Sequence, residues 1–337
     1  MLSPAEAQKG TPGPLIDEDR RWLTVMAATT LAELIWWSAA RVTGIAPYPS
    51  LLTYAALTFI GLGAAFAIRM ATRRHARRSS LRSAISGAAC VAIGGSLFLP
   101  LKFAIPRQVP FWLDGPLAHA ERSIFGADPW LLLDRLVGWA AVPMDLLYVL
   151  WLPVQLLILF TVMLEPSGAE KSRALMAYSL AWFLLGVAAA TLFSSAGPIF
   201  FDRLYGGADY GLLRETLQAR GAWVVLSESD AMWSAYVNGQ RGLLTGISAL
   251  PSIHVAIAFW IFLTARSLVP RLAKGALVYF FLMWLGSVQL GWHYVSDGLA
   301  GAVGMLVIWI LASVIHGIFE RSGKPSSAAK ADCRAGI

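Results

Sequence analysis

The chain has 337 residues, of which 57% are hydrophobic, 14% are charged and 14 are tryptophan. In a soluble globular domain, about a quarter of the residues are charged. Despite the net charge of +7, the composition therefore argues against an ordinary soluble enzyme or nucleic-acid-binding domain. It indicates a polytopic membrane protein with tryptophan at its interfaces.

Eight apolar runs predict eight membrane-spanning helices, because each approaches the ~20 residues that a helix needs to cross a bilayer. They lie at residues 22–40, 51–68, 84–105, 142–164, 174–193, 251–269, 275–292 and 298–319. The expected fold class is an all-α polytopic membrane helical bundle. We expect the first run to be a span and not a cleaved signal peptide, because it is long, lacks an Ala-x-Ala exit and precedes further spans.

The predicted organisation follows from these runs. Residues 1–21 form a cytoplasmic tail, 22–82 hold two N-terminal spans, 83–319 form a membrane core, and 320–337 form a disordered cytoplasmic tail. We find no internal repeat and no second soluble domain. The two cysteines, Cys90 and Cys333, supply neither a disulfide framework nor a metal-ligand spacing.

Lysine and arginine are unevenly distributed between the loops, and this sets the expected orientation. Most of them fall in the two tails, in the run "RMATRRHARRSSLR" at 69–82, and in short turns near 165–173 and 266–274. The positive-inside rule therefore places both termini in the cytoplasm. We interpret the run at 69–82 as a topology determinant beside anionic lipid and not as a nucleic-acid site.

Two long segments then face the outer side of the membrane. Residues 106–141 are amphipathic and too polar to span, so they are expected to lie along the interface. Residues 194–250 exceed the usual length of a connection, and loops of this length usually carry function. A solvated connector is the alternative for residues 194–250.

Two histidines and an aspartate mark a candidate site on that outer side. Pro251 and Ser252 suit the start of the sixth apolar helix, and His254 falls in its first turn, where unpaired N–H groups favour an anion. His293 and Asp297, in "GWHYVSDGLAG", are four residues apart, so on a helix they share one face. A capping or packing pair is the alternative for these two residues. The hairpin of the sixth and seventh helices returns both histidines to one side, which favours a catalytic site.

These residues resemble the motifs of the type 2 phosphatidic acid phosphatase superfamily. "PSIH" at 251–254 matches its second motif, and "HYVSD" at 293–297 matches the end of its third. Within the superfamily, "ALPSIH", "HYVSDGLAG" and "ERSIFGADPW" most resemble the inositol phosphorylceramide synthase branch. The resemblance covers about residues 106–315. It implies a six-helix catalytic core to which the first two spans are added.

The chain departs from the phosphatase branch of that superfamily in two places. It has no Arg-Pro dipeptide, and "AGPIFFDR" at 196–203 lies where the first motif would fall. Ser287 stands where the phosphatase branch has an arginine. Both departures favour the transferase-like branch and leave the phosphate-binding cation open. The candidates are Arg203 and Arg241, with Lys102 and helix N–H groups as alternatives.

The resemblance and the residues together predict phosphoryl transfer through a phosphohistidine. His293 would attack phosphorus, Asp297 would hold its other nitrogen, and His254 would act as the general acid and then as the general base. Ser252 and the helix N-terminus would bind the non-bridging oxygens. This chemistry requires no metal and no cofactor.

The expected substrates are a phospholipid and a lipid or other hydroxyl acceptor, as in the transfer of phosphoinositol. With water as the acceptor, the same site makes a lipid phosphate or pyrophosphate phosphatase. A non-enzymatic lipid transporter or scaffold is a third interpretation. The site is expected on the periplasmic, extracellular or lumenal face, and the sequence predicts no oligomeric state.

Four other ionisable residues receive non-catalytic interpretations. Glu33 lies mid-span, where we expect it to contact a partner helix or to snorkel. His119 lies in the amphipathic outer segment, within reach of the site, but a surface position is favoured. His75 and His316 fall on the cytoplasmic side.

Overall fold

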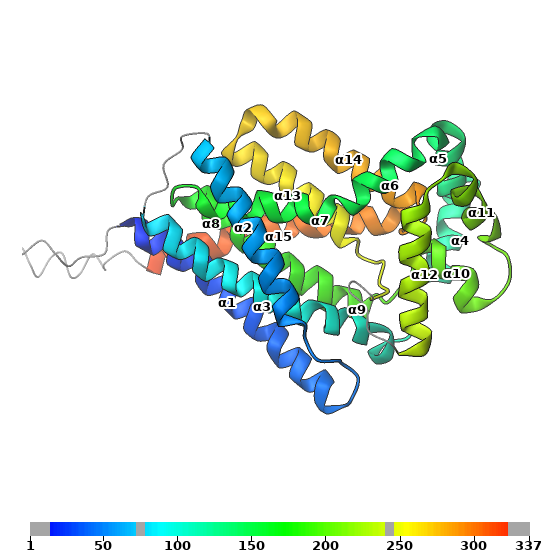
Figure 1. Ribbon diagram of the computed structural model, residues 1–337, viewed down its shortest axis with the longest axis horizontal. Helices are drawn as coiled ribbons and strands as arrows, with labels where there is room; N and C mark the ends of the chain where they lie inside the picture. The colour runs from blue at the N-terminus through cyan, green and yellow to red at the C-terminus, as the bar shows by residue number, and fades with distance from the viewer. Residues whose placement is uncertain (1–13, 72–77, 240–245, 323–337) are drawn as a thin grey trace, which may run out of the picture.

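The computed structural model describes residues 14–71, 78–239 and 246–322. Every regular element within those ranges is helical (Figure 1), which confirms the predicted all-α class. The predictions for the ends of the two tails (1–13 and 323–337) and for His75, Arg241 and Cys333 fall outside the described residues.

The eight apolar runs all coincide with helices. The first three runs are α1 (Pro14–Val42), α2 (Leu51–Ala71) and α3 (Arg78–Gln108). The fourth is divided between α6 (Ala141–Val149) and α7 (Trp151–Leu164), and the fifth between α8 (Ala169–Phe183), a π-helical segment (Leu184–Ala189) and α9 (Ala190–Leu192). The last three are α13 (Ile253–Leu268), α14 (Ala273–Gln289) and α15 (Val295–Ser322). Both predicted tails are too long, because α1 already begins at Pro14 and α15 continues to Ser322.

Within the described ranges, six helical segments are long and apolar enough to cross a membrane unaided. A seventh candidate is the pair Pro129–Val149 and Trp151–Leu164, which is bent by 45°. The remaining run, the sixth along the chain, forms α13, whose 16 residues reach about 24 Å at 1.5 Å per residue. A hydrocarbon core is ~30 Å thick. Helix α13 packs against α7, α8, α14 and α15. Because these helices surround it, α13 does not have to match the full thickness of the hydrocarbon core.

Five amphipathic helices cover one end of the bundle, at the right of Figure 1. They are α4 (Asp114–Phe125), α5 (Pro129–Val137), α10 (Pro198–Tyr205), α11 (Gly211–Arg220) and α12 (Trp223–Asn238). They enclose a second hydrophobic core that includes Trp130, Phe200 and Leu213. Residues 194–250, where described, are therefore packed helices and not a solvated connector. We call this end the capped end.

The opposite end carries the first and last described residues, and we call it the terminal end (Figure 1). There His316 Nε2 lies 2.8 Å from Glu18 Oε2, which ties α15 to α1. Glu18, His316 and Glu320 lie close enough together to share a metal ion. Arg21 already occupies this group, since its Nη1 donates to Glu18 Oε1 at 2.5 Å and lies 3.9 Å from Glu320 Oε1. An ion-pair network therefore accounts for it.

Candidate active site

His254 lies in the first turn of α13, at the capped end, as the sequence predicts. Ser252 is the N-cap residue, and its hydroxyl accepts a hydrogen bond from Val255 N at 3.4 Å. The His254 ring stacks on Tyr148 with 4.7 Å between centroids and contacts Trp151 at 4.2 Å. The Trp151 Nε1–H donates to the His254 carbonyl at 3.2 Å. The two aromatic rings therefore fix the imidazole from the side of α6 and α7.

His293 lies in the short turn between α14 and α15, two residues before α15 begins. Its Nδ1 is 3.3 Å from Asp297 Oδ2, and the same oxygen accepts the Tyr294 N–H at 3.0 Å. An ionised Asp297 only accepts, so with the carboxylate in that form we assign the proton to Nδ1 and the lone pair to Nε2. The predicted contact is present, although His293 precedes the helix. Asp297 also caps the turn, so the alternative capping interpretation describes part of its role.

The two motifs are joined through their backbones. The Ser252 N–H donates to the Asp297 carbonyl at 3.0 Å. Gly301 lies one turn further along α15, and a Cβ there would lie 2.4 Å from the Ser252 carbonyl oxygen. Helices α13 and α15 therefore touch backbone to backbone at this point. The imidazole centroids of His254 and His293 are 6.0 Å apart as a result.

The segment "AGPIFFDR" supports the His293 turn. The Ala196 and Gly197 N–H groups both donate to the buried carboxylate of Asp114, the Gly197 bond to Oδ1 being 2.8 Å long. Gly197 has φ 96°, and a Cβ there would lie 2.3 Å from the Trp292 carbonyl oxygen. The Ile199 N–H donates to the Gly291 carbonyl at 2.9 Å. Burial raises the pKa of Asp114, and the two N–H donors oppose that rise.

A second buried acid supports the other side of the turn. Glu121 Oε1 accepts both the N–H and the hydroxyl of Ser296, at 2.7 and 2.8 Å. Sequence reasoning did not assign Asp114 or Glu121. The signal available was their spacing of seven residues within the amphipathic segment, which places two acids on one helical face.

The predicted phosphate-binding residues are not brought together. Ser252 is fully buried and its side chain caps α13, so it lies behind His254 and not on the cavity surface. Arg203 donates to Asp230 and lies 5.7 Å over the Trp233 ring, away from the cavity. Arg241 lies outside the described residues. Among the described residues that line the cavity, Lys102 is the only lysine or arginine.

Lys102 affects the histidine chemistry. Burial, reinforced by the positive charge of Lys102, lowers the pKa of His293 to about 3. The imidazole therefore stays neutral at physiological pH and keeps its nucleophilic lone pair. Ser287, at the position where the phosphatase branch has an arginine, is buried and accepts the His293 N–H on its carbonyl at 3.2 Å.

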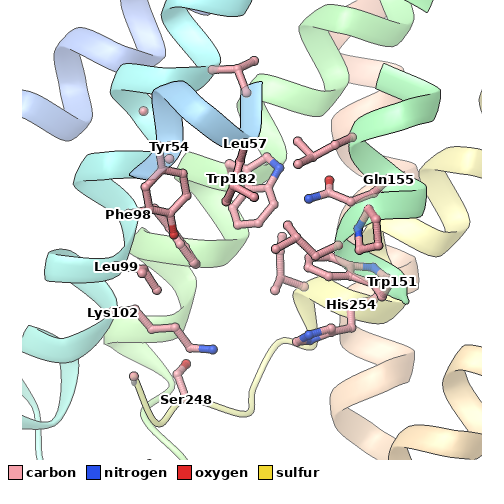
Figure 2. A pocket seen from close by; sticks show the side chains of 18 of the residues that line it. Tyr54, Leu57, Phe98, Leu99, Lys102, Trp151, Gln155, Trp182, Ser248 and His254 are labelled. Atoms are coloured by element: carbon pink, nitrogen blue, oxygen red, sulfur yellow. The ribbon is translucent and has the colours of Figure 1, made fainter. Parts of the chain in front are cut away.

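The two histidines open onto a cavity of about 420 Å³. Figure 2 shows Lys102, Ser248 and His254 at one end of it, and Tyr54, Leu57 and Gln155 towards the other. Its walls are mostly apolar and come from α1, α2, α3, α7, α8 and α12 as well as from the histidine motifs. Glu33 lines this cavity and is 4% exposed, so it does not snorkel. His119 is exposed on α4 and lies outside the cavity lining.

A family model described as the PAP2 superfamily matches residues 116–311. No curated protein and no solved structure matches the chain. The matched region runs from α4 into α15 and contains both histidines and Asp297. Helices α1 to α3 lie outside the matched region, although they supply part of the cavity wall and Lys102.

Proposed function

The chain belongs to the PAP2 superfamily, and on that premise we propose that it is an integral membrane phosphotransferase that moves a phospho-headgroup from a phospholipid to a hydroxyl acceptor. One observation carries the proposal. His254, His293 and Lys102 lie together at one end of a mostly apolar cavity. The phosphate of a lipid fits the polar end, and its hydrocarbon fits the rest.

In the first half-reaction, the Nε2 lone pair of His293 attacks phosphorus. A P–N bond forms, and the bond from phosphorus to the lipid oxygen breaks. His254 enters this step in its protonated form and gives its proton to the departing alkoxide, which leaves as the lipid alcohol. Asp297 holds Nδ1–H of His293 and stabilises the positive charge that develops on the ring. The phospho-headgroup is then carried on His293.

In the second half-reaction, the acceptor hydroxyl occupies the place of the lost alcohol. His254, now neutral, takes the hydroxyl proton while the oxygen attacks phosphorus. The P–N bond breaks, and its electrons return to Nε2. Both histidines are restored to their starting states. A water molecule in the same position would give hydrolysis, so the acceptor decides between transferase and phosphatase.

Lys102 supplies the positive charge in this mechanism. The non-bridging oxygens of the phosphorus centre carry spread negative charge in the transition state, and a preorganised cation stabilises it. Lys102 has no ion-pair partner among the described residues, so its ammonium group is available to the substrate. The N–H groups of the first turn of α13 add a favourable dipole.

Two features support a transferase of the inositol phosphorylceramide synthase type. The Arg-Pro dipeptide and the arginine at position 287 of the phosphatase branch are both missing. The cavity also reaches between the three N-terminal helices, which adds apolar surface for the hydrocarbon of a lipid donor or acceptor. We place the capped end on the outer side of the membrane, because the basic residues of the short loops gather at the terminal end.

The test is an assay of the purified protein with a phospholipid labelled in its headgroup phosphate, with and without a long-chain alcohol as acceptor. The proposal predicts a labelled lipid whose amount depends on the acceptor. Release of labelled headgroup phosphate to water, with no effect of the alcohol, would identify a phosphatase. Neither product, with protein that still binds phospholipid, would favour a transporter or scaffold.

A further inference from the structure

The part of the cavity farthest from the histidines carries polar groups without protein partners. The Glu33 carboxyl lines it and is 4% exposed, yet makes no hydrogen bond or ion pair with any described residue. The Tyr54 hydroxyl is likewise unpaired within the described part of the chain. Gln155 Oε1 accepts the Tyr178 hydroxyl at 2.8 Å, so its Nε2 is turned away from that bond and has no partner of its own.

These groups line the same part of the cavity. Figure 2 shows Tyr54 and Gln155 on opposite walls of the cavity, with Trp182 between them. Glu33 lies beside Gly94 of α3, since a Cβ on that glycine would be 2.9 Å from Glu33 Oε2. Both Gly94 and Lys102 line the cavity on α3, and the helix rises about 12 Å over the eight steps from one to the other. The Glu33 carboxyl, beside Gly94, is therefore about 12 Å along α3 from Lys102.

An arrangement of this kind is costly without a ligand. Burying a polar group without a hydrogen bond costs roughly 1–3 kcal/mol by mutational measures. An ionisable residue within a membrane span is a candidate for binding a ligand or partner. The surroundings of Glu33 include no described basic side chain other than Lys102 along the whole cavity. Its partner is therefore to be sought in what the cavity holds.

We propose that Glu33, Tyr54 and Gln155 bind a hydroxyl group carried on the hydrocarbon chain of the lipid substrate. The inference rests on the proposed function, which places the lipid phosphate beside Lys102 and so directs the chain towards Glu33. A hydroxyl both donates and accepts, so it can pair with a carboxyl oxygen of Glu33 or with the Gln155 N–H. A methylene group forms no hydrogen bond with either side chain and leaves their polar groups unsatisfied.

The test compares two phospholipids that differ only in one mid-chain hydroxyl on an acyl chain. Their dissociation constants are measured in His293→Ala protein, so that binding is read without turnover. We expect the hydroxylated lipid to bind about threefold to tenfold tighter, the range of one or two neutral hydrogen bonds. Glu33→Leu should abolish this preference and Tyr54→Phe should reduce it. Leu57→Met, at an apolar position of the same wall, is the matched control and should keep it.

Equal binding of the two lipids would overturn the inference and leave a site that holds water only. If Glu33→Leu protein fails to fold, Glu33→Met and Tyr54→Phe decide, because each keeps most of the side-chain volume and removes the hydrogen-bonding group. A preference that survives both variants would also overturn it. Failure of the proposed function gives a different result. Protein that prefers the hydroxylated lipid but transfers no headgroup would support the hydroxyl-binding site and contradict the proposed reaction.

Discussion

The Ser252 N–H donates to the Asp297 carbonyl at 3.0 Å, so the residue that begins α13 is bonded to the residue that holds His293. This bond fixes the spacing between the motifs that carry His254, the proposed general acid, and His293, the proposed nucleophile. It is possible only because Gly301 lets the two backbones meet, a Cβ there falling 2.4 Å from the Ser252 carbonyl oxygen.

Gly301→Ala should therefore separate the two histidines. The added methyl group meets backbone and not a flexible side chain, so a helix must shift, at a cost of about 1–3 kcal/mol of folding free energy. We expect turnover to fall about tenfold to a hundredfold, since small displacements of reacting groups have effects of this size. The control is Gly317→Ala on the same helix, where the methyl group meets nothing within 4 Å. Unchanged turnover in Gly301→Ala would show that the contact does not position the site.

Lys102→Gln should lose most of the stabilisation of the transition state. By analogy with a single oxyanion donor, we expect a loss of about 2–4 kcal/mol in kcat/KM, with kcat falling more than KM rises. Arg203→Gln is the comparison, because Arg203 pairs with Asp230 at a partly exposed position. Such pairs contribute about 1 kcal/mol or less. The assignment of Lys102 as the phosphate-binding cation would be wrong if Arg203→Gln, and not Lys102→Gln, caused the loss in kcat/KM.

The pH dependence of the attack step follows from His293. Its pKa is lowered to about 3 by burial and by Lys102, so protonation removes the nucleophile only at low pH. With a nitrophenyl phosphate ester, whose leaving group needs little help from His254, the rate should stay flat well below the ordinary histidine value of 6.5. Lys102→Gln removes a positive charge and should move the acid limb to higher pH. An acid limb near 6.5 in the unmodified enzyme would contradict this account.

His254→Ala should show its role through the leaving group. The defect should be large with a phospholipid, whose alkoxide needs a proton, and much smaller with the nitrophenyl ester. The two substrates are compared on the same protein preparation, so folding effects cancel. Equal defects with both substrates would exclude a general-acid role.

Asp114→Asn should weaken the support of the His293 turn without touching the substrate. An amide offers one acceptor oxygen where the carboxylate offers two, and both carboxylate oxygens accept the Ala196 N–H. We expect a loss of about 1–3 kcal/mol in the free energy of unfolding, together with reduced turnover. Asp209→Asn, at an exposed ion pair with Arg122, is the matched control and should change neither by much.

The sequence predicts the helices and the histidine motifs well, for local reasons. A long run of apolar residues favours a buried or membrane-spanning helix whichever neighbours it packs against. This explains why all eight runs coincide with helices. Pro251 and Ser252 mark a helix start by their own backbone chemistry. The contact between His293 and Asp297 depends on only five consecutive residues.

The remaining parts of the site depend on packing between distant segments. Lys102 lies within an apolar run, and nothing local shows that its side chain faces histidines that lie 152 and 191 residues later in the chain. Asp114 and Glu121 look like surface acids of an amphipathic helix until their backbone partners at 196–197 and 296 are placed. The motif predicts that Ser252 binds phosphate, which stays a prediction; the structure adds that its hydroxyl oxygen caps α13.

The central claim is that His293 carries the phospho-headgroup, and trapping that intermediate tests it most directly. The purified protein is mixed with phospholipid labelled in its phosphate, quenched in alkali and mapped by peptide mass. We predict an acid-labile label on the peptide that contains His293, absent from His293→Ala protein and lost to labelled lipid when a hydroxyl acceptor is added. Turnover at the normal rate with His293→Ala, or a label on another residue, would contradict the account.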